Sequence, residues 1–200
     1  KITLFLQAGS SLEYGKRKFP NKENDKCRPN SIYGRSKLKS TEYLENSGLN
    51  FIVLRLYQIY GPHQKINRII PLAIFNLKKF SYFESTSGIQ QRDFIHVDDL
   101  ISLVTKIIKK KKIKSGIFNV GKGKAISVKK LLQKIEKNIN FGKIYFGKLK
   151  MRKDEPKILV PSIKRIKKYY NWEPKINLET GLRRTIKYYE KEISVGKYNS

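Results

Sequence analysis

Hydrophobic positions along the chain fall into two patterns. Short apolar runs bounded by turn residues such as glycine and proline are typical of buried strands. Such runs occupy residues 1–8, 51–56, 117–120 and 143–146. Between them, longer segments repeat apolar residues every three or four positions, which is the spacing of an amphipathic helix. These segments cover residues 31–47, 69–78, 98–110, 127–135 and 178–191.

The order of the two patterns predicts the fold class. Strands that alternate with helices of roughly 10–15 residues favour a parallel sheet in an α/β protein. Residues 16–30 are polar and contain Pro20 and Pro29, so we expect a loop there. Residues after 194 are expected to fray, as chain ends often do.

Composition excludes several classes of protein. The 200 residues, 39% of them apolar, suit a folded chain of one domain with at most a small appendage. A single cysteine, Cys27, excludes a disulfide framework, and two histidines are too few for a histidine-based metal site. No run approaches the roughly 18 apolar residues of a membrane span, and no signal peptide is visible, so we expect a cytoplasmic protein without a membrane partner.

The net charge of +28, from 44 basic and 16 acidic residues, at first suggests nucleic acid as a partner. However, 34 of the basic residues are lysine and only 10 are arginine, whereas base readout and phosphate clamping favour arginine. The lysines are also spread over the whole chain, with one dense run at residues 109–112. We therefore attribute the charge to compositional drift and do not expect a nucleic-acid partner.

Tyr33 and Lys37 are the first candidates for chemistry. They lie four residues apart in an expected helix, so they share a face. A cation beside a phenol stabilises its deprotonated form, which suits a tyrosine to general acid–base work. The spacing alone decides little, because Tyr14 and Lys18 repeat it within the expected loop.

Ser10 and Ser11 are the second group of candidates. They follow the first expected strand, and ligands bind at the carboxyl ends of strands in parallel sheets. A serine hydroxyl at this position would hold a substrate oxygen beside Tyr33.

Eight short motifs then follow one another in a familiar order. They are GSSLEYG at 9–15, YGRSK at 33–37, LRLYQIYGP at 54–62, RDFIHVDDL at 92–100, FNVGKG at 118–123, R-x-x-E at 152–155, NWEP at 171–174 and LETGL at 178–182. Together they resemble the extended short-chain dehydrogenase/reductases that act on nucleotide sugars, the NAD-dependent epimerase/dehydratase family. The resemblance covers nearly the whole chain.

The resemblance implies the C-terminal portion of a Rossmann-like parallel sheet and a small α/β substrate-binding lobe. Residues 1–64 would be a remnant of the catalytic domain, and residues 65–194 would complete the sheet and form the lobe, followed by a frayed tail at 195–200. Family members begin with a Gly-x-x-Gly-x-x-Gly turn that holds the cofactor diphosphate. Because the chain lacks that motif and starts on what resembles the fifth strand, we expect a fragment without most of the cofactor cleft.

The resemblance also implies a reaction. Tyr33 would exchange a proton with the sugar hydroxyl or carbonyl, most often at C4, while a nicotinamide of NAD or NADP takes or gives the hydride. Lys37 would stabilise the Tyr33 phenolate, and together they would bind the nicotinamide ribose. Ser10 would hold the reacting oxygen.

The expected substrate is a nucleoside-diphosphate sugar. Arg92 and Arg152 would meet its diphosphate, where a guanidinium fork suits paired phosphate oxygens. Glu155 would accept hydrogen bonds from the nucleotide ribose. Ser11 would add a further contact, as would Gln58, which stands where the family often has a substrate-binding Asn.

One departure narrows the reaction. The 4,6-dehydratases of this family carry Thr-Asp-Glu where this chain has Ser-Ser-Leu at 10–12, so epimerisation or ketosugar reduction is favoured over dehydration. The residues do not decide whether the reaction is epimerisation or reduction. They also leave open which nucleotide base the substrate carries and whether the protein forms a homodimer. The alternative is a non-catalytic basic protein that binds RNA or acidic surfaces.

Several other polar and glycine residues have structural explanations. We expect Asp98 and Asp99 to supply the N-cap and a first-turn acid of the helix that follows. His96 is expected to be a packing or loop residue and Trp172 a core or hinge residue. The Gly-x-Gly at 121–123 is expected to form a turn.

Overall fold

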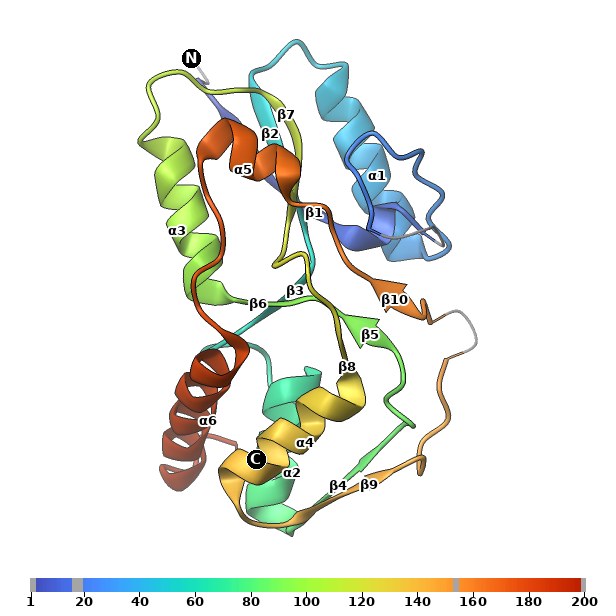
Figure 1. Cartoon of the computed structure of the whole chain (residues 1–200), viewed down its shortest axis with the longest axis vertical. Coiled ribbons are helices and arrows are strands. Elements are labelled where there is room, and N and C mark those ends of the chain that lie inside the picture. The colour runs from blue at the N-terminus through green and yellow to red at the C-terminus, as the bar shows by residue number, and fades with distance from the viewer. Residues whose placement is uncertain (1–2, 16–19, 153–154, 199–200) are drawn as a thin grey trace.

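The computed structural model describes residues 3–15, 20–152 and 155–198 (Figure 1). In chain order the elements are β1 (Phe5–Ser10), η1 (Ser11–Glu13), α1 (Ile32–Glu45), β2 (Phe51–Leu56), β3 (Gln58–Tyr60), α2 (Ile69–Phe80), β4 (Tyr82–Ser85), β5 (Gln91–Arg92), β6 (Phe94–His96), α3 (Val97–Ile108), β7 (Gly116–Val120), β8 (Ile126–Ser127), α4 (Val128–Ile139), β9 (Lys143–Phe146), β10 (Ile158–Leu159), α5 (Lys164–Tyr170) and α6 (Leu178–Ser194). This mixture of helices and mostly parallel strands confirms the expected α/β fold class.

A three-stranded parallel sheet forms one half of the molecule, with β2 between β1 and β7. Ile52 and Leu54 of β2 pack in a core that includes side chains of α3 and α5, whereas Val53 packs with Leu44 of α1. Figure 1 shows α1 on one side of this sheet and α3 and α5 on the other. Because β2 is covered on both faces, its apolar residues are consecutive, and residues 51–56 therefore predict a strand clearly.

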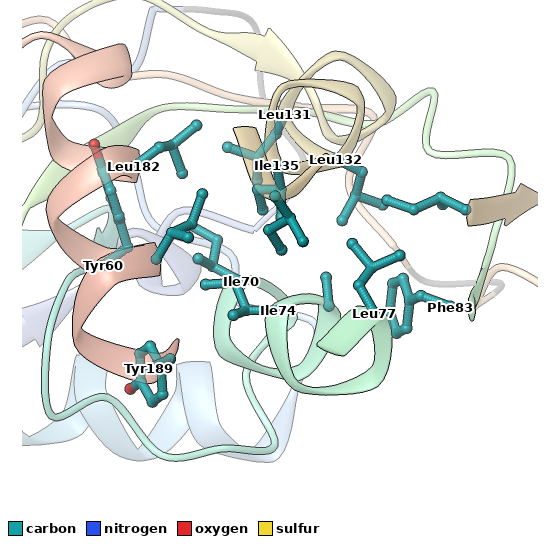
Figure 2. Close-up of a cluster of buried hydrophobic side chains, with 14 of the residues drawn as sticks. Tyr60, Ile70, Ile74, Leu77, Phe83, Leu131, Leu132, Ile135, Leu182 and Tyr189 are labelled. Atoms are coloured by element: carbon teal, nitrogen blue, oxygen red, sulfur yellow. The ribbon is translucent and has the colours of Figure 1, made fainter. Parts of the chain in front are cut away.

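The other half is organised by α2, α4 and α6 around a second core. Figure 2 shows Ile74 of α2, Ile135 of α4 and Leu182 of α6 pointing toward one another. All three side chains are at most 1% exposed. On each helix, the buried side chains recur every three or four residues, and this apolar periodicity predicts the three helices from the sequence.

Within the described ranges, short strands form three further small sheets, and the pair β4–β9 packs in the second core. β3 pairs with β6 in parallel, β4 with β9 in parallel, and β5 lies between β10 and β8. The sequence does not predict β3, β5, β6, β8 or β10, because two or three residues are too few to show a period. It also misses the four-residue β4, although β9, its partner of the same length, is predicted. It also misses α5, which has only seven residues.

Asn21 ties the polar loop of residues 20–30 to the sheet. Its backbone N–H donates to the Val160 carbonyl at 3.0 Å, and its carbonyl accepts from Asn119 Nδ2 at 3.0 Å. Its side-chain Oδ1 accepts from the Tyr57 hydroxyl at 2.9 Å. The loop is therefore fastened to the end of β7 and to the segment that follows β2.

The start of α3 differs from the expectation. His96, and not Asp98, is the N-cap: its backbone is extended, and its Nδ1 accepts from the Asp98 N–H at 3.2 Å. The helix begins one residue earlier than expected, so both aspartates lie in its first turn. Asp99 accepts the backbone N–H of Lys175 at 2.8 Å, which holds the segment after Trp172 against α3.

The described end of the C-terminal segment packs against the second core. Residues after α6 turn back, and the Tyr198 ring lies 6.2 Å from the Phe75 ring and 6.4 Å from the Tyr189 ring. These aromatic contacts bury apolar surface between the segment after α6 and the two helices. No helix in the described part of the chain is long and apolar enough to cross a bilayer.

Candidate active site

Gly34 decides how the first turn of α1 meets the end of β1. A Cβ at this position would lie 2.5 Å from the Leu12 carbonyl oxygen and 3.0 Å from Pro29 Cβ. Only glycine therefore allows η1 to pack this closely on α1. Ser31 caps the helix by accepting the Gly34 N–H at 3.0 Å. The turn after β1 is thus placed directly against the helix turn that carries Tyr33.

Tyr33 and Lys37 lie together on α1, as their spacing predicts. The Lys37 ammonium is 5.8 Å from the centre of the Tyr33 ring. The same ammonium donates to the Ala8 carbonyl at 2.9 Å, which anchors α1 to β1. The Tyr33 side chain is 54% exposed and can therefore reach a ligand.

Tyr14, the other tyrosine with a lysine four residues on, occupies a different environment. It is fully buried, and its hydroxyl donates to Asn119 Oδ1 at 2.8 Å. Burial raises the pKa of its phenol well above the usual range, which disfavours proton transfer at neutral pH. Its partner Lys18 lies outside the described residues. Accessibility therefore distinguishes Tyr33 as the candidate acid–base group.

Glu13 holds the serine turn in place, a role that the sequence does not reveal. Its Oε1 accepts the Ser10 N–H at 2.7 Å, and its Oε2 accepts from Thr41 Oγ1 at 3.1 Å and from Arg55 Nε at 2.8 Å. One buried carboxylate thus joins the end of β1 to α1 and β2. A signal that could have found the pair is the presence of a charged residue among apolar ones in each segment, Glu13 in the turn after the first strand and Arg55 in the run at 51–56.

Four of the predicted substrate contacts meet at one cavity. Gln58, Arg92, Arg152 and Glu155 all line a cavity of about 330 Å³. A second cavity of about 440 Å³ shares these four residues and extends to Leu12. Both volumes fall in the range of small-molecule sites.

The serines lie beside these cavities and do not line them. Ser10 and Ser11 are 7% and 3% exposed, and Ser10 Oγ accepts the Leu12 N–H at 3.2 Å. Leu12, the next residue, is the point at which the serine turn reaches the second cavity. The residues predicted for catalysis and those predicted for substrate binding therefore occupy adjoining surfaces.

Arg92 is the buried cation of the cavity. Its side chain is 6% exposed, pairs with the Glu155 carboxylate and donates to the Gln91 carbonyl at 2.7 Å. Burial lowers the pKa of the Arg92 guanidinium, and Glu155 only partly opposes that effect. Such a cation is stabilised further by any additional anion.

Arg68 is a third arginine at the cavity and was missed from the sequence. It is the N-cap residue of α2, where no side chain caps the helix, and it lines both cavities. Three of the ten arginines thus line the first cavity, whereas none of its described lining residues is a lysine. Because this chain has 34 lysines and only ten arginines, each arginine is a candidate for a specific role, and that signal could have identified Arg68.

Asp93 fixes the turn at residues 121–123 against the cavity wall. It is fully buried and accepts the backbone N–H of Lys122 at 2.7 Å and of Lys124 at 3.0 Å. Its carbonyl accepts the Gln58 N–H at 3.0 Å. Burial raises the pKa of the Asp93 carboxyl to about 6. Gly123 has φ of +72°, a conformation that favours glycine, so these glycines serve a turn.

Tyr33 and Lys37 present polar groups of the kind that one end of a nicotinamide cofactor would require. The half-exposed Tyr33 hydroxyl and the Lys37 ammonium beside it are suitable hydrogen-bonding partners for ribose hydroxyls. Among the described residues no cluster of three or more histidine, cysteine or acidic side chains is arranged to hold a metal ion.

A family model, the NAD dependent epimerase/dehydratase family, matches residues 1–121. The chain belongs to this family. The match spans more than half of the chain and includes the serine turn, the Tyr33–Lys37 pair, Gln58 and Arg92. The resemblance predicted from the motifs is thereby confirmed.

Curated relatives from the family are similar over much of this chain. CDP-abequose synthase of Salmonella muenchen is 37% identical over 56% of the chain and 39% of its own length. UDP-glucuronate 4-epimerase of Thermodesulfobacterium geofontis is 31% identical over 81% and 50%. dTDP-4-dehydro-6-deoxyglucose reductase of Escherichia coli is 28% identical over 92% and 60%. The chain thus spans about half the length of these relatives.

Solved structures of family epimerases have the same fold. UDP-glucuronic acid 4-epimerase of Bacillus cereus, in complex with UDP-glucuronic acid and NAD, matches with a TM-score of 0.87 and 25% identity, over 96% of this chain and 62% of that one. UDP-N-acetylglucosamine 4-epimerase of Methanobrevibacter ruminantium M1, in complex with UDP-N-acetylmuramic acid, matches with the same TM-score and identity, over 96% and 64%. These matches confirm the Rossmann-like fold class.

Proposed function

We propose that this chain supplies catalytic and substrate-binding residues for an NAD- or NADP-dependent nucleotide-sugar epimerase or 4-ketosugar reductase. The observation that carries the proposal is the adjacency of two groups. Tyr33 and Lys37 lie on the helix that packs against the serine turn, and that turn reaches the arginine-lined cavity through Leu12.

Tyr33 is the proposed acid–base group. Its hydroxyl would exchange a proton with a sugar hydroxyl or carbonyl, and Lys37 would stabilise the phenolate. Ser10 Oγ would hold the reacting oxygen from the other side. A nicotinamide, when bound, would supply the acceptor or donor of the hydride.

The cavity is the proposed site of the nucleoside diphosphate. Arg92 and Arg152 would bind the diphosphate through forked, charge-assisted hydrogen bonds. Glu155 would accept hydrogen bonds from the ribose, and Gln58 would contact the remaining polar groups. Ser11, on the adjoining serine turn, would add a contact outside the cavity. The cavity volumes and the excess of arginine over acidic residues in its wall support this assignment.

The serine turn favours epimerisation or reduction over dehydration. Residues 10–12 offer two hydroxyls and a leucine, so they provide no acid and base for eliminating water. The neighbouring carboxylate of Glu13 is fully buried and occupied by Arg55, and it is not available to substrate.

Binding is the first test, because it does not require turnover. In calorimetry, UDP-glucuronic acid and other nucleoside-diphosphate sugars should bind the chain, and Arg92→Met should abolish or strongly weaken that binding. NAD and NADP are titrated separately. Failure of every sugar nucleotide to bind, with RNA retained on a filter at moderate salt, would favour the basic binding protein instead.

Turnover is the second test. With cofactor and substrate that bind, Tyr33→Phe should abolish sugar interconversion while leaving substrate affinity nearly unchanged. Tyr43→Phe, on an exposed position of the same helix, is the matched control and should retain activity. A 4-keto-6-deoxy product from a nucleoside-diphosphate hexose would contradict the assignment against dehydration.

A further inference from the structure

The Arg92 guanidinium already has an anionic partner in the cavity. Glu155, 63 positions further along the chain, places its Oε1 on Arg92 Nη2. The proposed function assigns the same guanidinium to the substrate diphosphate. Substrate and Glu155 would therefore compete for one cation.

The cavity as a whole attracts anions. In the first cavity, Arg68, Arg92 and Arg152 are the cationic lining residues, and Glu155 is the one acidic lining residue in the described part of the chain. The N-terminus of α2 also lies in the wall, without a side-chain cap, and the helix dipole favours negative charge there. Without further discrimination, inorganic phosphate or diphosphate would satisfy these groups as well as a nucleotide does.

The two partners of the ion pair are unequally exposed. The Arg92 side chain is 6% exposed, whereas that of Glu155 is 28% exposed. Arg92 is also held by its bond to the Gln91 carbonyl at 2.7 Å. Opening the pair would therefore move Glu155 and leave the guanidinium in place for the incoming anion.

The identity of the anion decides what happens to the displaced carboxylate. An inorganic diphosphate presents mostly ionised oxygens, which repel a carboxylate, so Glu155 loses its charge-assisted hydrogen bond to Arg92 without a comparable partner on the ligand. A nucleoside diphosphate carries ribose hydroxyls, which donate to a carboxylate. The same diphosphate group is therefore bound at a lower net cost when a ribose accompanies it.

We propose that Glu155 makes the cavity selective for ribose-bearing diphosphates by occupying Arg92 until ribose hydroxyls replace the guanidinium as its partners. This inference rests on the proposed function, because it takes the cavity to be the nucleotide-sugar site. Glu155 is thus a specificity-determining residue that discriminates against inorganic anions of similar charge.

The test compares inorganic pyrophosphate with uridine diphosphate by calorimetry in magnesium-free buffer. Glu155→Gln should tighten pyrophosphate binding by on the order of tenfold, because the competing charge is gone. It should leave uridine diphosphate binding unchanged or weaker, so the preference for the nucleotide falls. Glu190→Gln removes the same charge from a half-exposed ion pair with Lys78 that lines neither cavity, and it should change both affinities little.

Glu155→Asp is a second variant that keeps the inference testable if Glu155→Gln does not fold. It keeps the charge but shortens the reach to Arg92, so its pyrophosphate affinity should lie between those of the wild type and Glu155→Gln. If Glu155→Gln binds pyrophosphate no more tightly than Glu190→Gln does, the selectivity inference is wrong. If the wild type and all variants fail to bind uridine diphosphate, the proposed function fails as well.

Discussion

Glu13 and Arg55 form a fully buried ion pair, with 2.8 Å between Glu13 Oε2 and Arg55 Nε and side chains 0% and 3% exposed. The pair joins the turn after β1 to the middle strand of the sheet. Its position makes the geometry of the serine turn dependent on a charge interaction in the core.

Removing one member of this pair should be strongly destabilising. Glu13→Gln leaves the Arg55 guanidinium buried without a counter-charge, which typically costs about 3–5 kcal/mol. Lys134→Met, which breaks the half-exposed pair with Glu179, is the control and should cost less than about 1 kcal/mol. Urea unfolding measures both. Equal losses in the two variants would contradict the role given to Glu13.

Gly34→Ala should destabilise the protein although alanine is the better helix former. Propensity alone would favour alanine by roughly 0.5–1 kcal/mol. The new Cβ would meet the Leu12 carbonyl at 2.5 Å, so η1 must shift, at a cost of about 1–3 kcal/mol. Ser36→Ala on the exposed face of α1 controls for propensity. A stabilised Gly34→Ala variant would show that η1 does not pack on the helix.

Asp93 should make stability depend on pH between about 4 and 6. Because its pKa in the folded protein is raised to about 6, above the usual value for aspartate, the folded state holds the proton more tightly. The contribution of protonated Asp93 to the free energy of unfolding is fully present below pH 4. It is lost as the pH rises through 6, by on the order of 2–3 kcal/mol.

The Asp93→Asn variant tests the predicted direction of this pH dependence. The unfolding free energy of the wild type minus that of Asp93→Asn should fall as the pH is raised from 4 to 7 in urea titrations. Asp98→Asn removes a half-exposed carboxylate nearby and serves as the charge control. A difference that stays constant or grows with pH would exclude a burial-raised pKa at Asp93.

Arg68 should contribute to ligand affinity without contributing to turnover chemistry. Arg68→Met removes one cation from the cavity wall and should weaken uridine diphosphate binding by on the order of tenfold. Lys65→Met removes an equal charge from an exposed site that does not line the cavities. If both variants weaken binding equally, only the overall positive charge of the protein matters.

The sequence predicts the long elements and the local pair well, for physical reasons. The strand at 51–56 is buried on both faces, and Tyr33 and Lys37 meet because helical spacing alone places them together. Gln58, Arg92 and Glu155 could be assigned to one site only through the family resemblance. Nothing local in the sequence indicates that β3, β5 and the segment before β10 converge.

Other features of the site depend on contacts between distant segments. The bonds of Glu13 reach 28 positions to Thr41 and 42 positions to Arg55, so no short motif encodes them. The capping of α3 by His96 was missed because aspartate is the more common N-cap residue, and two aspartates followed.

The bonds made by Asn21 have a practical consequence for engineering. By composition, residues 20–30 would be the natural place to insert a tag, a label or a cleavage site. Because Asn21 is held at once by Val160, Tyr57 and Asn119, an insertion there would unfasten three separate parts of the chain. The exposed turn around Gly48 is the more permissive position, because a Cβ atom added there would meet no other atom within 4 Å.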